Sequence, residues 1–312
     1  MRGWFWVLIT ALAGVALTAQ GRAPAPANTF RSRVDLISVT ATVVDHDGRL
    51  VPGLPKDAFE LYEDGERQAV AQFTNDRVPV SLAVLLDVSD SMYGQRLADA
   101  RAAVEQFLFE LLDPADEFCV LAFNHQPRLL TPWTQSQDVV RQALAGLMPF
   151  GATGMYDAVI TALPLMETRS RERAAVLIIS DGADTASDST VHDVRSALLR
   201  SDSFAYAIAI DPPARRAINT GVNVSALTDI TSGSGGSTEV VHDTADLAEA
   251  GARIADELNK QYLLGYVSPH ALDGKYHSIR VHAVDPAYRV RARNGYVASA
   301  AIPSQRRKGA EK

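Results

Sequence analysis

The sequence predicts an α/β protein built on an open, mostly parallel sheet with helices on both faces, accompanied by a small antiparallel β domain. Two observations carry this prediction. Nearly unbroken apolar runs, such as Leu82 to Leu86 and Ala174 to Ile179, alternate with stretches of helical spacing, which is the pattern of βαβ units in a parallel sheet. On both flanks of that region apolar residues instead alternate one by one with polar residues, which is typical of antiparallel strands with one wet face.

Length and composition limit the classes of protein. The 312 residues exceed what one hydrophobic core usually carries, so we expect two structural units. An apolar share of 47% and a charged share of 21% are those of an ordinary globular protein. A net charge of -7 provides no general attraction to nucleic acid or to anionic lipid, so a nucleic-acid partner is disfavoured.

Residues 1–20 have the layout of a secretory signal peptide. Arg2 precedes an apolar stretch from Trp4 to Leu17, and small residues stand before Gln20. We therefore predict an exported protein, periplasmic or secreted, whose mature chain starts near Gln20 without a transmembrane span. An uncleaved membrane anchor is the alternative, although the stretch is shorter than the roughly 20 apolar residues that a spanning helix needs.

The N-terminal flank reads as a linker followed by strands. Residues 21–29 are rich in proline, and residues 30–76 form the N-terminal part of the predicted β domain. Apolar and polar residues alternate from Ile37 to Val43, as in an antiparallel strand. The turn dipeptide Asp64-Gly65 predicts a hairpin whose second strand covers Gln68 to Phe73.

The C-terminal flank, residues 260–300, returns to the same alternation after an Asp273-Gly274 turn. Since neither flank is large enough to be stable alone, we predict one β domain into which the α/β unit, residues 78–258, is inserted. Residues 301–312 are a polar, basic tail.

Helices and strands alternate throughout the α/β unit. The helix after the first strand ends at Asp113-Pro114, and Thr190 with Asp193 opens a later helix as a capping box. The remaining predicted elements are strands at 117–123, 174–179 and 204–210 and helices around 140–147, 159–166 and 247–258.

Polar side chains stand where the predicted strands end. Asp87, Ser89 and Ser91 follow the strand from Leu82, Thr153 lies in a glycine-flanked loop, and Asp181 comes just after another strand. The carboxyl ends of parallel strands meet at one edge of a sheet, so these oxygens are expected to converge. Carboxylate and hydroxyl oxygens suit a hard cation, Mg²⁺ or Mn²⁺.

Three separated motifs resemble the metal-ion-dependent adhesion site of von Willebrand factor type A domains. They are Asp87-x-Ser89-x-Ser91, Gly151-Ala-Thr153-Gly and Ile178-Ile-Ser-Asp181-Gly182, and the resemblance covers residues 78–258. It implies the fold of these domains, a Rossmann-like open sheet. It also implies that Ser89, Ser91 and Thr153 bind Mg²⁺ through their hydroxyls, whereas Asp87 and Asp181 hold it mainly through water and hydrogen bonds.

The resemblance implies a binding function. Because neither carboxylate is expected to bind the ion directly, the ion keeps an open position for an Asp or Glu of a protein partner, and in the family movement of the last helix can accompany capture. We predict an exported protein-binding module and not an enzyme. The flanking motifs Phe59-Glu-Leu-Tyr-Glu-Asp-Gly65, Tyr262-Leu-Leu-Gly-Tyr266 and Asn294-Gly-Tyr296 resemble those of exported bacterial proteins of this group and carry no known chemistry.

Other interpretations stay open. The same ion could serve a Mg²⁺-dependent hydrolase or phosphotransferase, or it could be idle in a structural envelope component. Asp-x-Ser-x-Ser is also a helix-capping cluster. We favour plain loop or capping roles for the neighbouring acids Asp90, Asp157, Asp184 and Asp188, and no catalytic base is recognisable.

Three further patterns are assigned no chemistry. The glycine-rich stretch Thr231 to Ser237 reads as flexible and lacks the lysine of a phosphate-binding loop. Arg289, Arg291 and Arg293 read as the polar face of one strand. None of the seven histidines has a recognisable metal-binding spacing, so they read as surface or turn residues.

Overall fold

The computed structural model describes residues 36–181, 183–210, 223–270 and 273–298. The predicted signal peptide, linker and C-terminal tail lie outside these residues. Within them, no helix has the length and apolar character needed to cross a membrane.

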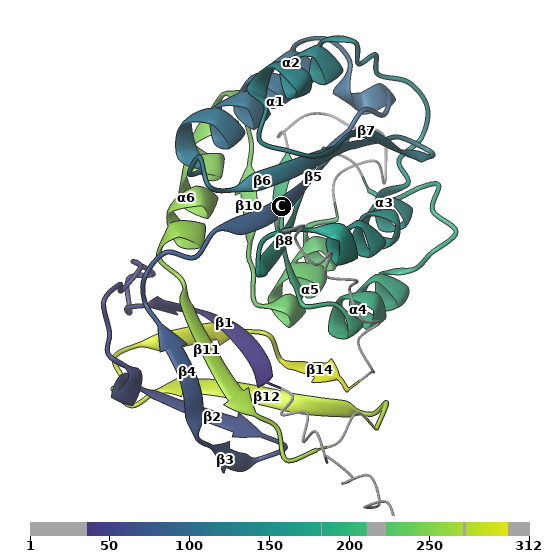
Figure 1. Ribbon diagram of the computed structural model, residues 1–312. Helices are drawn as coiled ribbons and strands as arrows, with labels where there is room; N and C mark the ends of the chain where they lie inside the picture. Colours follow the sequence, from purple (N-terminus) through teal and green to yellow (C-terminus); the bar gives the residue numbers. More distant parts are fainter. Residues whose placement is uncertain (1–35, 182, 211–222, 271–272, 299–312) are drawn as a thin grey trace, which may run out of the picture. The chain divides into compact units, whose positions relative to one another are not determined.

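A six-stranded sheet forms the centre of the α/β part, with the strand order β10-β9-β8-β5-β6-β7 (Figure 1). All neighbours in it are parallel except the edge strand β7, which runs antiparallel to β6. The order reverses at β5, which has β6 on one side and β8 on the other, and such a reversal is where open α/β sheets bind ligands. The strands are β5 (Val80–Asp87), β6 (Glu117–Phe123), β7 (Pro127–Thr134), β8 (Arg173–Ser180), β9 (Ser203–Ile210) and β10 (Thr238–Val241).

Helices cover both faces of this sheet, so the predicted fold class is confirmed. Leu82, Val84 and Leu86 of β5 pack into a core with α1, α2 and α6, while Ala83 and Leu85 pack with α3, α4 and α5. The helices are α1 (Gln95–Gln106), α2 (Gln137–Ala145), α3 (Met155–Ala162), α4 (Val191–Arg200), α5 (Val224–Ser234) and α6 (Leu247–Asn259), with shorter helical segments at Lys56–Ala58, Asp90–Met92, Phe107–Leu111, Leu163–Thr168 and Thr244–Asp246.

In the α/β part, the apolar runs and the capping box correctly predicted the buried strands and the start of one helix. Strands β5, β6, β8 and β9 are buried along their whole length, which is why their sequences are unbroken apolar runs. Helix α4 begins with the predicted capping box: the Thr190 hydroxyl accepts a hydrogen bond from the Asp193 backbone, and the Asp193 carboxylate accepts one from the Thr190 backbone.

In the α/β part, strands β7 and β10 and helix α5 were not predicted. Strand β7 is a half-exposed edge that contains Pro132, which weakens its strand signal. Helix α5 and strand β10 meet at Ser234-Gly235-Gly236, so the interpretation of Thr231 to Ser237 as flexible was wrong. Gly235 ends the helix with a positive φ of 97°, and Gly236 packs so tightly that a Cβ there would lie 1.9 Å from the carbonyl oxygen of Ala205.

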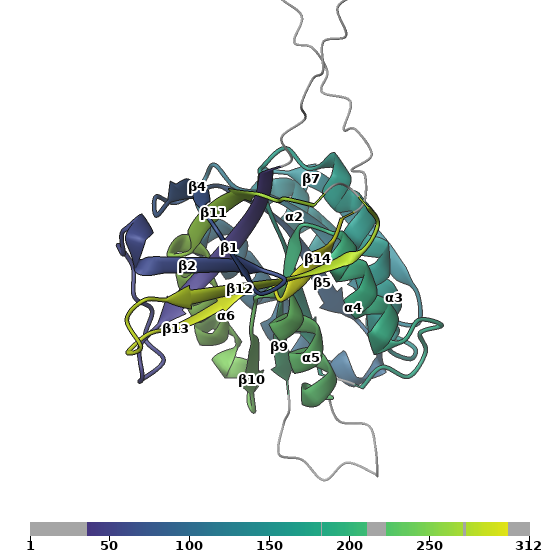
Figure 2. The ribbon, with the colours of Figure 1, turned by 90° about the horizontal axis from the view of Figure 1, so that it is seen from below.

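The two flanks pair with each other in two four-stranded sheets, β13-β1-β11-β4 and β14-β12-β2-β3 (Figure 1, Figure 2). Strand β1 lies between β13 and β11, and β12 lies beside β2, always antiparallel. The antiparallel β part is thus present; its exact domain limits stay a prediction. Its strands are β1 (Leu36–Val44), β2 (Phe59–Glu63), β3 (Glu66–Gln68), β4 (Val70–Thr74), β11 (Tyr262–Val267), β12 (Tyr276–Ala283), β13 (Arg289–Ala292) and β14 (Gly295–Val297).

The predicted hairpin is shorter than expected. Asp64 and Gly65, both with positive φ, form its turn, and the pairing of β2 with β3 ends at Gln68. Strand β4 then leaves this sheet and pairs with β11 in the other one, so the stretch Gln68 to Phe73 is not a single hairpin strand.

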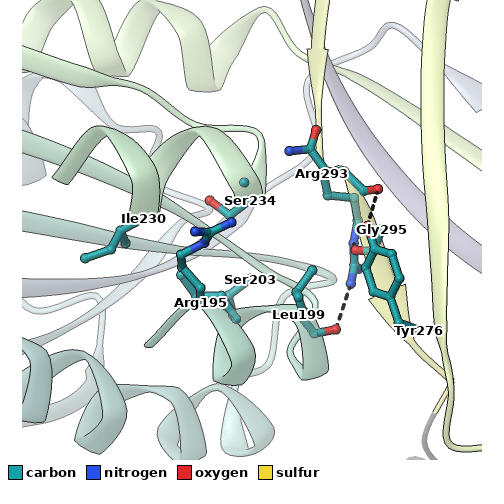
Figure 3. A pocket seen from close by; sticks show the side chains of 11 residues that line it. Arg195, Leu199, Ser203, Ile230, Ser234, Tyr276, Arg293 and Gly295 are labelled. Carbon is teal, nitrogen blue, oxygen red and sulfur yellow. Dashed lines mark hydrogen bonds between the residues drawn. The ribbon is translucent and has the colours of Figure 1, made fainter. Parts of the chain in front are cut away.

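Arg289, Arg291 and Arg293 do not simply form the polar face of one strand, because β13 ends at Ala292 and two of the three arginines have specific partners. Arg291 is hydrogen-bonded to Glu257 of α6. Arg293 donates from Nε to the carbonyl of Gly295 (3.0 Å) and from Nη2 to the carbonyls of Leu199 (3.5 Å) and Ser201 (3.3 Å). It lines a cavity of about 350 Å³, where Figure 3 shows it beside Gly295 and Leu199. Both guanidinium groups therefore connect the β part to the α/β part.

Candidate metal-ion site

The turn after β5 starts with a fully buried carboxylate. Asp87 Oδ1 accepts a hydrogen bond from the backbone of Ser89 (2.8 Å), and Oδ2 accepts one from the Ser180 hydroxyl (2.6 Å). Burial raises the pKa of Asp87 to about 6, aided by the nearby charge of Asp181 and opposed by these hydrogen bonds. Since both oxygens already have protein partners, an indirect role toward a cation fits Asp87.

Three oxygens from two chain segments lie in a row at this edge of the sheet. The hydroxyls of Ser89 and Ser91 are 3.0 Å apart, and the Ser91 hydroxyl donates to Asp181 Oδ1 at 2.5 Å. Neighbouring ligands of an octahedral Mg²⁺, each 2.0–2.1 Å from the ion, are about 2.9 Å apart. The distance between the Ser89 and Ser91 hydroxyls therefore fits two neighbouring ligands of a small divalent cation, whereas the shorter contact of Ser91 with Asp181 is a hydrogen bond.

The loop that carries Thr153 is held against the same turn by backbone hydrogen bonds. Phe150 donates to the carbonyl of Val88 and Asp90 donates to the carbonyl of Gly151, both at 2.9 Å. Thr153 is buried, and its backbone bonds to the segment around Thr185. Among the described residues its hydroxyl has no hydrogen-bond partner, so it can serve a ligand.

An arginine side chain that the sequence analysis did not single out lies beside these oxygens. Arg96, in the first turn of α1, donates from Nη1 to Asp181 Oδ2 (2.8 Å) and to the carbonyl of Ser91 (3.0 Å). No local pattern marks this arginine, because its partner is 85 residues away. A divalent ion at this position would compete with the Arg96 guanidinium for the negative charge of Asp181.

The neighbouring acids organise loops. Asp184 accepts hydrogen bonds from the Tyr156 backbone (2.8 Å) and the Ser187 hydroxyl (2.7 Å). Asp157 was expected to cap its own helix; instead it accepts from the backbones of Asp188 (2.9 Å) and Ser189 (3.0 Å), and these hydrogen bonds outweigh burial and lower its pKa.

The loops that carry Ser91 and Thr153 also carry exposed apolar side chains. Tyr93 is 79% exposed, Met148 73% and Phe150 53%. The His125 ring lies edge-on to Phe150 and directly against Gly151, two residues from Thr153. These positions are close to the motifs in sequence, but their exposure follows only from the way the loops meet.

Residues 82–183 match the sequence model of the von Willebrand factor type A domain. A solved structure described as von Willebrand factor type A from Catenulispora acidiphila aligns with 86% of this chain and 74% of its own chain, at 14% identity and a TM-score of 0.51. The match to the family's sequence model and the similarity in fold thus point to the same kind of domain. The chain therefore contains a von Willebrand factor type A domain, which is a class of protein-interaction module.

Two further relatives are informative. The inter-alpha-trypsin inhibitor heavy chain H4 of Homo sapiens is 22% identical over 143 residues, which is 42% of this chain but only 15% of the relative. Proximal thread matrix protein 1 from the mussel byssus, solved with zinc in its metal-ion-dependent adhesion site, aligns with 68% of this chain and 50% of its own at 17% identity and a TM-score of 0.50. At that identity the likeness concerns the fold alone.

Proposed function

We propose that this protein is an exported protein-binding module that captures an acidic side chain of a partner at a divalent-cation site made by Asp87, Ser89, Ser91, Thr153 and Asp181. The observation that supports it is the spacing of the Ser89 and Ser91 hydroxyls, which matches neighbouring ligands of a small cation, in a part of the chain where Tyr93, Met148 and Phe150 are exposed. Oxygen-only donors favour Mg²⁺, with Mn²⁺ as the alternative ion. Export rests on the pattern of residues 1–20.

The chain's own residues have distinct tasks in this proposal. Ser89, Ser91 and Thr153 offer neutral hydroxyls, while Asp87 and Asp181 supply charge from buried positions. A bound divalent ion would supply an electrophilic position for a partner carboxylate. Tyr93 and Phe150 would contact the partner around it, since aromatic side chains are enriched in protein interfaces.

The proposal favours binding over catalysis. Asp87 is engaged by Ser89 and Ser180, and Asp181 by Ser91 and Arg96, so neither carboxylate is placed as a free base. His125 lies at the edge of the site, but its ring packs on Phe150 and Gly151. Turnover of phosphate esters that is lost in both Ser89→Ala and His125→Ala would instead establish the hydrolase.

Isothermal titration with Mg²⁺ and Mn²⁺ tests the site directly. We expect the intact protein to bind one ion at this edge, and Ser89→Ala to weaken binding at least tenfold because a ligand is removed. Arg96→Gln should bind more tightly, since it removes a competing cation. Asp90→Asn is the matched control. Asp90 is an exposed acid of the same turn, and among the described residues it forms hydrogen bonds only through its backbone. An intact protein that ignores both ions would favour the structural component with an idle site.

The same preparation tests partner binding. A partner captured from an envelope fraction in the presence of Mg²⁺ should be released when a chelator removes the ion. The Tyr93→Ala variant should fail to capture this partner, although it should still bind Mg²⁺. Tyr276→Ala, another exposed aromatic residue but on β12, should capture it normally. Capture that persists in chelator would contradict a metal-dependent mechanism.

A further inference from the structure

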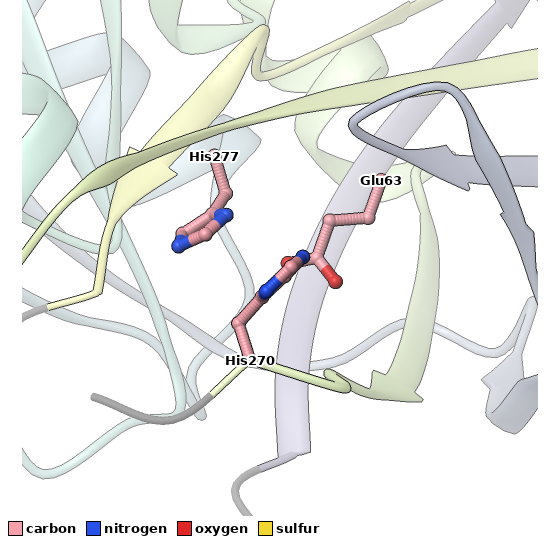
Figure 4. Close-up of side chains that lie close together, drawn as sticks. All are labelled: Glu63, His270 and His277. Atoms are coloured by element: carbon pink, nitrogen blue, oxygen red, sulfur yellow. The ribbon is translucent and has the colours of Figure 1, made fainter. Parts of the chain in front are cut away.

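Two histidines and a buried glutamate meet in the β part of the chain (Figure 4). Glu63 ends β2, His270 follows β11 and His277 lies in β12, and one ligand atom of each lies within 4.8 Å of the others. Glu63 is 1% exposed and His277 is buried, whereas His270 is accessible. These three residues lie in chain segments that contribute nothing to the adhesion-type site, so the cluster is independent of the proposed function.

Glu63 is a buried carboxylate that has histidines but, within the described part of the chain, no lysine or arginine beside it. Its oxygens accept hydrogen bonds from the hydroxyls of Tyr296 (2.7 Å) and Ser268 (3.0 Å). These two protons use about half of the roughly four acceptor positions of a carboxylate. Among the described residues no lysine or arginine forms an ion pair with Glu63, and buried charges are normally paired or bind metals.

A further buried group points to the same place. The hydroxyl of Tyr266 is buried without a hydrogen bond of normal geometry, and it interacts with Glu63 and Tyr296. The surroundings of Glu63 are therefore polar and incompletely satisfied.

Carboxylates also hold the two imidazole rings. Asp64 Oδ2 lies 2.7 Å from His277 Nδ1 and 3.5 Å from His270 Nε2, and Asp273 Oδ1 lies 3.3 Å from His277 Nε2. Histidines that bind metals commonly donate their other ring N–H to such a carboxylate, which orients the ring. The cluster thus combines two imidazoles with three acidic groups from different segments.

We propose that Glu63, His270 and His277 form a site for a divalent transition-metal ion, with Zn²⁺ as the ion that its ligands suit best. Imidazole nitrogen and carboxylate oxygen are Zn²⁺ ligands, whereas Mg²⁺ prefers oxygen alone. Asp64 is a positioning residue that orients His277 through Nδ1, so Nε2 is the nitrogen that would bind the ion, in place of its present contact with Asp273. The rings now stack with their centroids 4.1 Å apart, so His270 rotates out of the stack to share one ion, and its accessible position permits this.

The ion would connect segments of both β sheets. Glu63 and His277 belong to the sheet of β2 and β12, while His270 follows β11 of the other sheet. Zn²⁺ binding is therefore expected to raise the thermal stability of the folded chain, because an ion that binds only the folded state stabilises it.

Titration of the full chain with Zn²⁺, in saturating Mg²⁺ to occupy the oxygen site, tests the proposal, and Co²⁺ serves as a spectroscopic probe of nitrogen ligation. We expect one equivalent of Zn²⁺ and an intense visible Co²⁺ absorption. His270→Ala should weaken Zn²⁺ binding at least tenfold and abolish the absorption. Asp64→Asn, at a left-handed position that asparagine tolerates, should weaken binding by about 10–100-fold.

The control is His282→Ala, an exposed histidine of the same strand β12, which should bind Zn²⁺ as the intact chain does. Because His270 is accessible, its replacement is not expected to prevent folding, and Glu63→Gln provides an independent variant of the same size. Zn²⁺ affinity and Co²⁺ absorption that are unchanged in both His270→Ala and Glu63→Gln would overturn the site. Absence of Zn²⁺ binding under saturating Mg²⁺ would overturn it as well.

Discussion

Asp87, a member of the proposed cation site, is a carboxylate held in place by burial and by hydrogen bonds. It is buried beside Asp181, and its two oxygens accept hydrogen bonds from Ser89 and Ser180. Burial disfavours the ionised form, which is why the pKa of Asp87 is raised to about 6. The hydrogen bonds hold the carboxylate in place but do not neutralise it, so its negative charge remains available to a divalent ion.

The raised pKa of Asp87 predicts how stability changes with pH when divalent ions are removed. The unfolded chain releases this proton near pH 3.8 and the folded chain near pH 6, so the unfolded state is favoured as pH rises through this window. The loss should approach about 3 kcal/mol by pH 7. Asp87→Asn lacks this titration. We expect the free energies of unfolding in urea with chelator to diverge between pH 4 and 7, the intact protein losing more; parallel profiles would contradict the assignment.

The junction of α5 and β10 shows why one glycine-rich stretch was misread. Sequence composition treats Gly233, Gly235 and Gly236 alike, as flexible residues. In the fold, Gly235 ends the helix with a positive φ, Gly236 lies against the backbone of β9, and Gly233 faces open space. Gly235 is needed to end the helix, and Gly236 is needed because its backbone packs directly against β9. The second requirement depends on a strand some 30 residues earlier in the chain.

Substitutions at two of these glycines should have opposite effects. Gly236→Ala places a Cβ 1.9 Å from the Ala205 carbonyl oxygen, and because backbone cannot move aside easily we expect a loss of about 3 kcal/mol or more. Gly233→Ala meets nothing within 4 Å and lies in the last turn of a helix, so it should be neutral or stabilise by up to about 1 kcal/mol. Urea unfolding measures both. Equal effects would argue for a flexible loop.

For the whole molecule, a buried polar network joins the last helix to both parts of the chain. Glu257 of α6 accepts hydrogen bonds from Thr42 of β1 (3.0 Å) and Tyr206 of β9 (2.7 Å), and it pairs with Arg291 of β13. Gln261 then donates to both Tyr206 (2.9 Å) and Thr42 (3.2 Å). The end of α6 is therefore tied to a strand of the central sheet and to two strands of the β part.

Removing the charge of Glu257 should weaken this connection. We expect Glu257→Gln to lower the free energy of unfolding by about 1–3 kcal/mol, because Arg291 loses its charged acceptor. Glu249→Gln, which breaks an exposed pair with Arg253 on the same helix, should cost less than about 1 kcal/mol. A double-mutant cycle with Arg291→Met gives the coupling energy. A coupling near zero would show that Glu257 acts only through Thr42 and Tyr206.

Local sequence patterns were sufficient for the fold class, and they supply the proposed ligands of the adhesion-type site. Burial on both faces produces the unbroken apolar runs of β5 and β8. Asp87, Ser89, Ser91 and Asp181 come at or just after the ends of these two parallel strands, which lie at one edge of the sheet, whereas Thr153 lies in the loop between α2 and α3. What depended on long-range packing was not readable: Arg96 beside Asp181, Glu257 beside Arg291, and Glu63 beside His270 and His277. These partners are distant along the chain. Arg96 meets Asp181 because α1 and the end of β8 lie at the same edge of the central sheet, and the other pairs depend on how the strands of the two flanks pair. No local pattern encodes either arrangement.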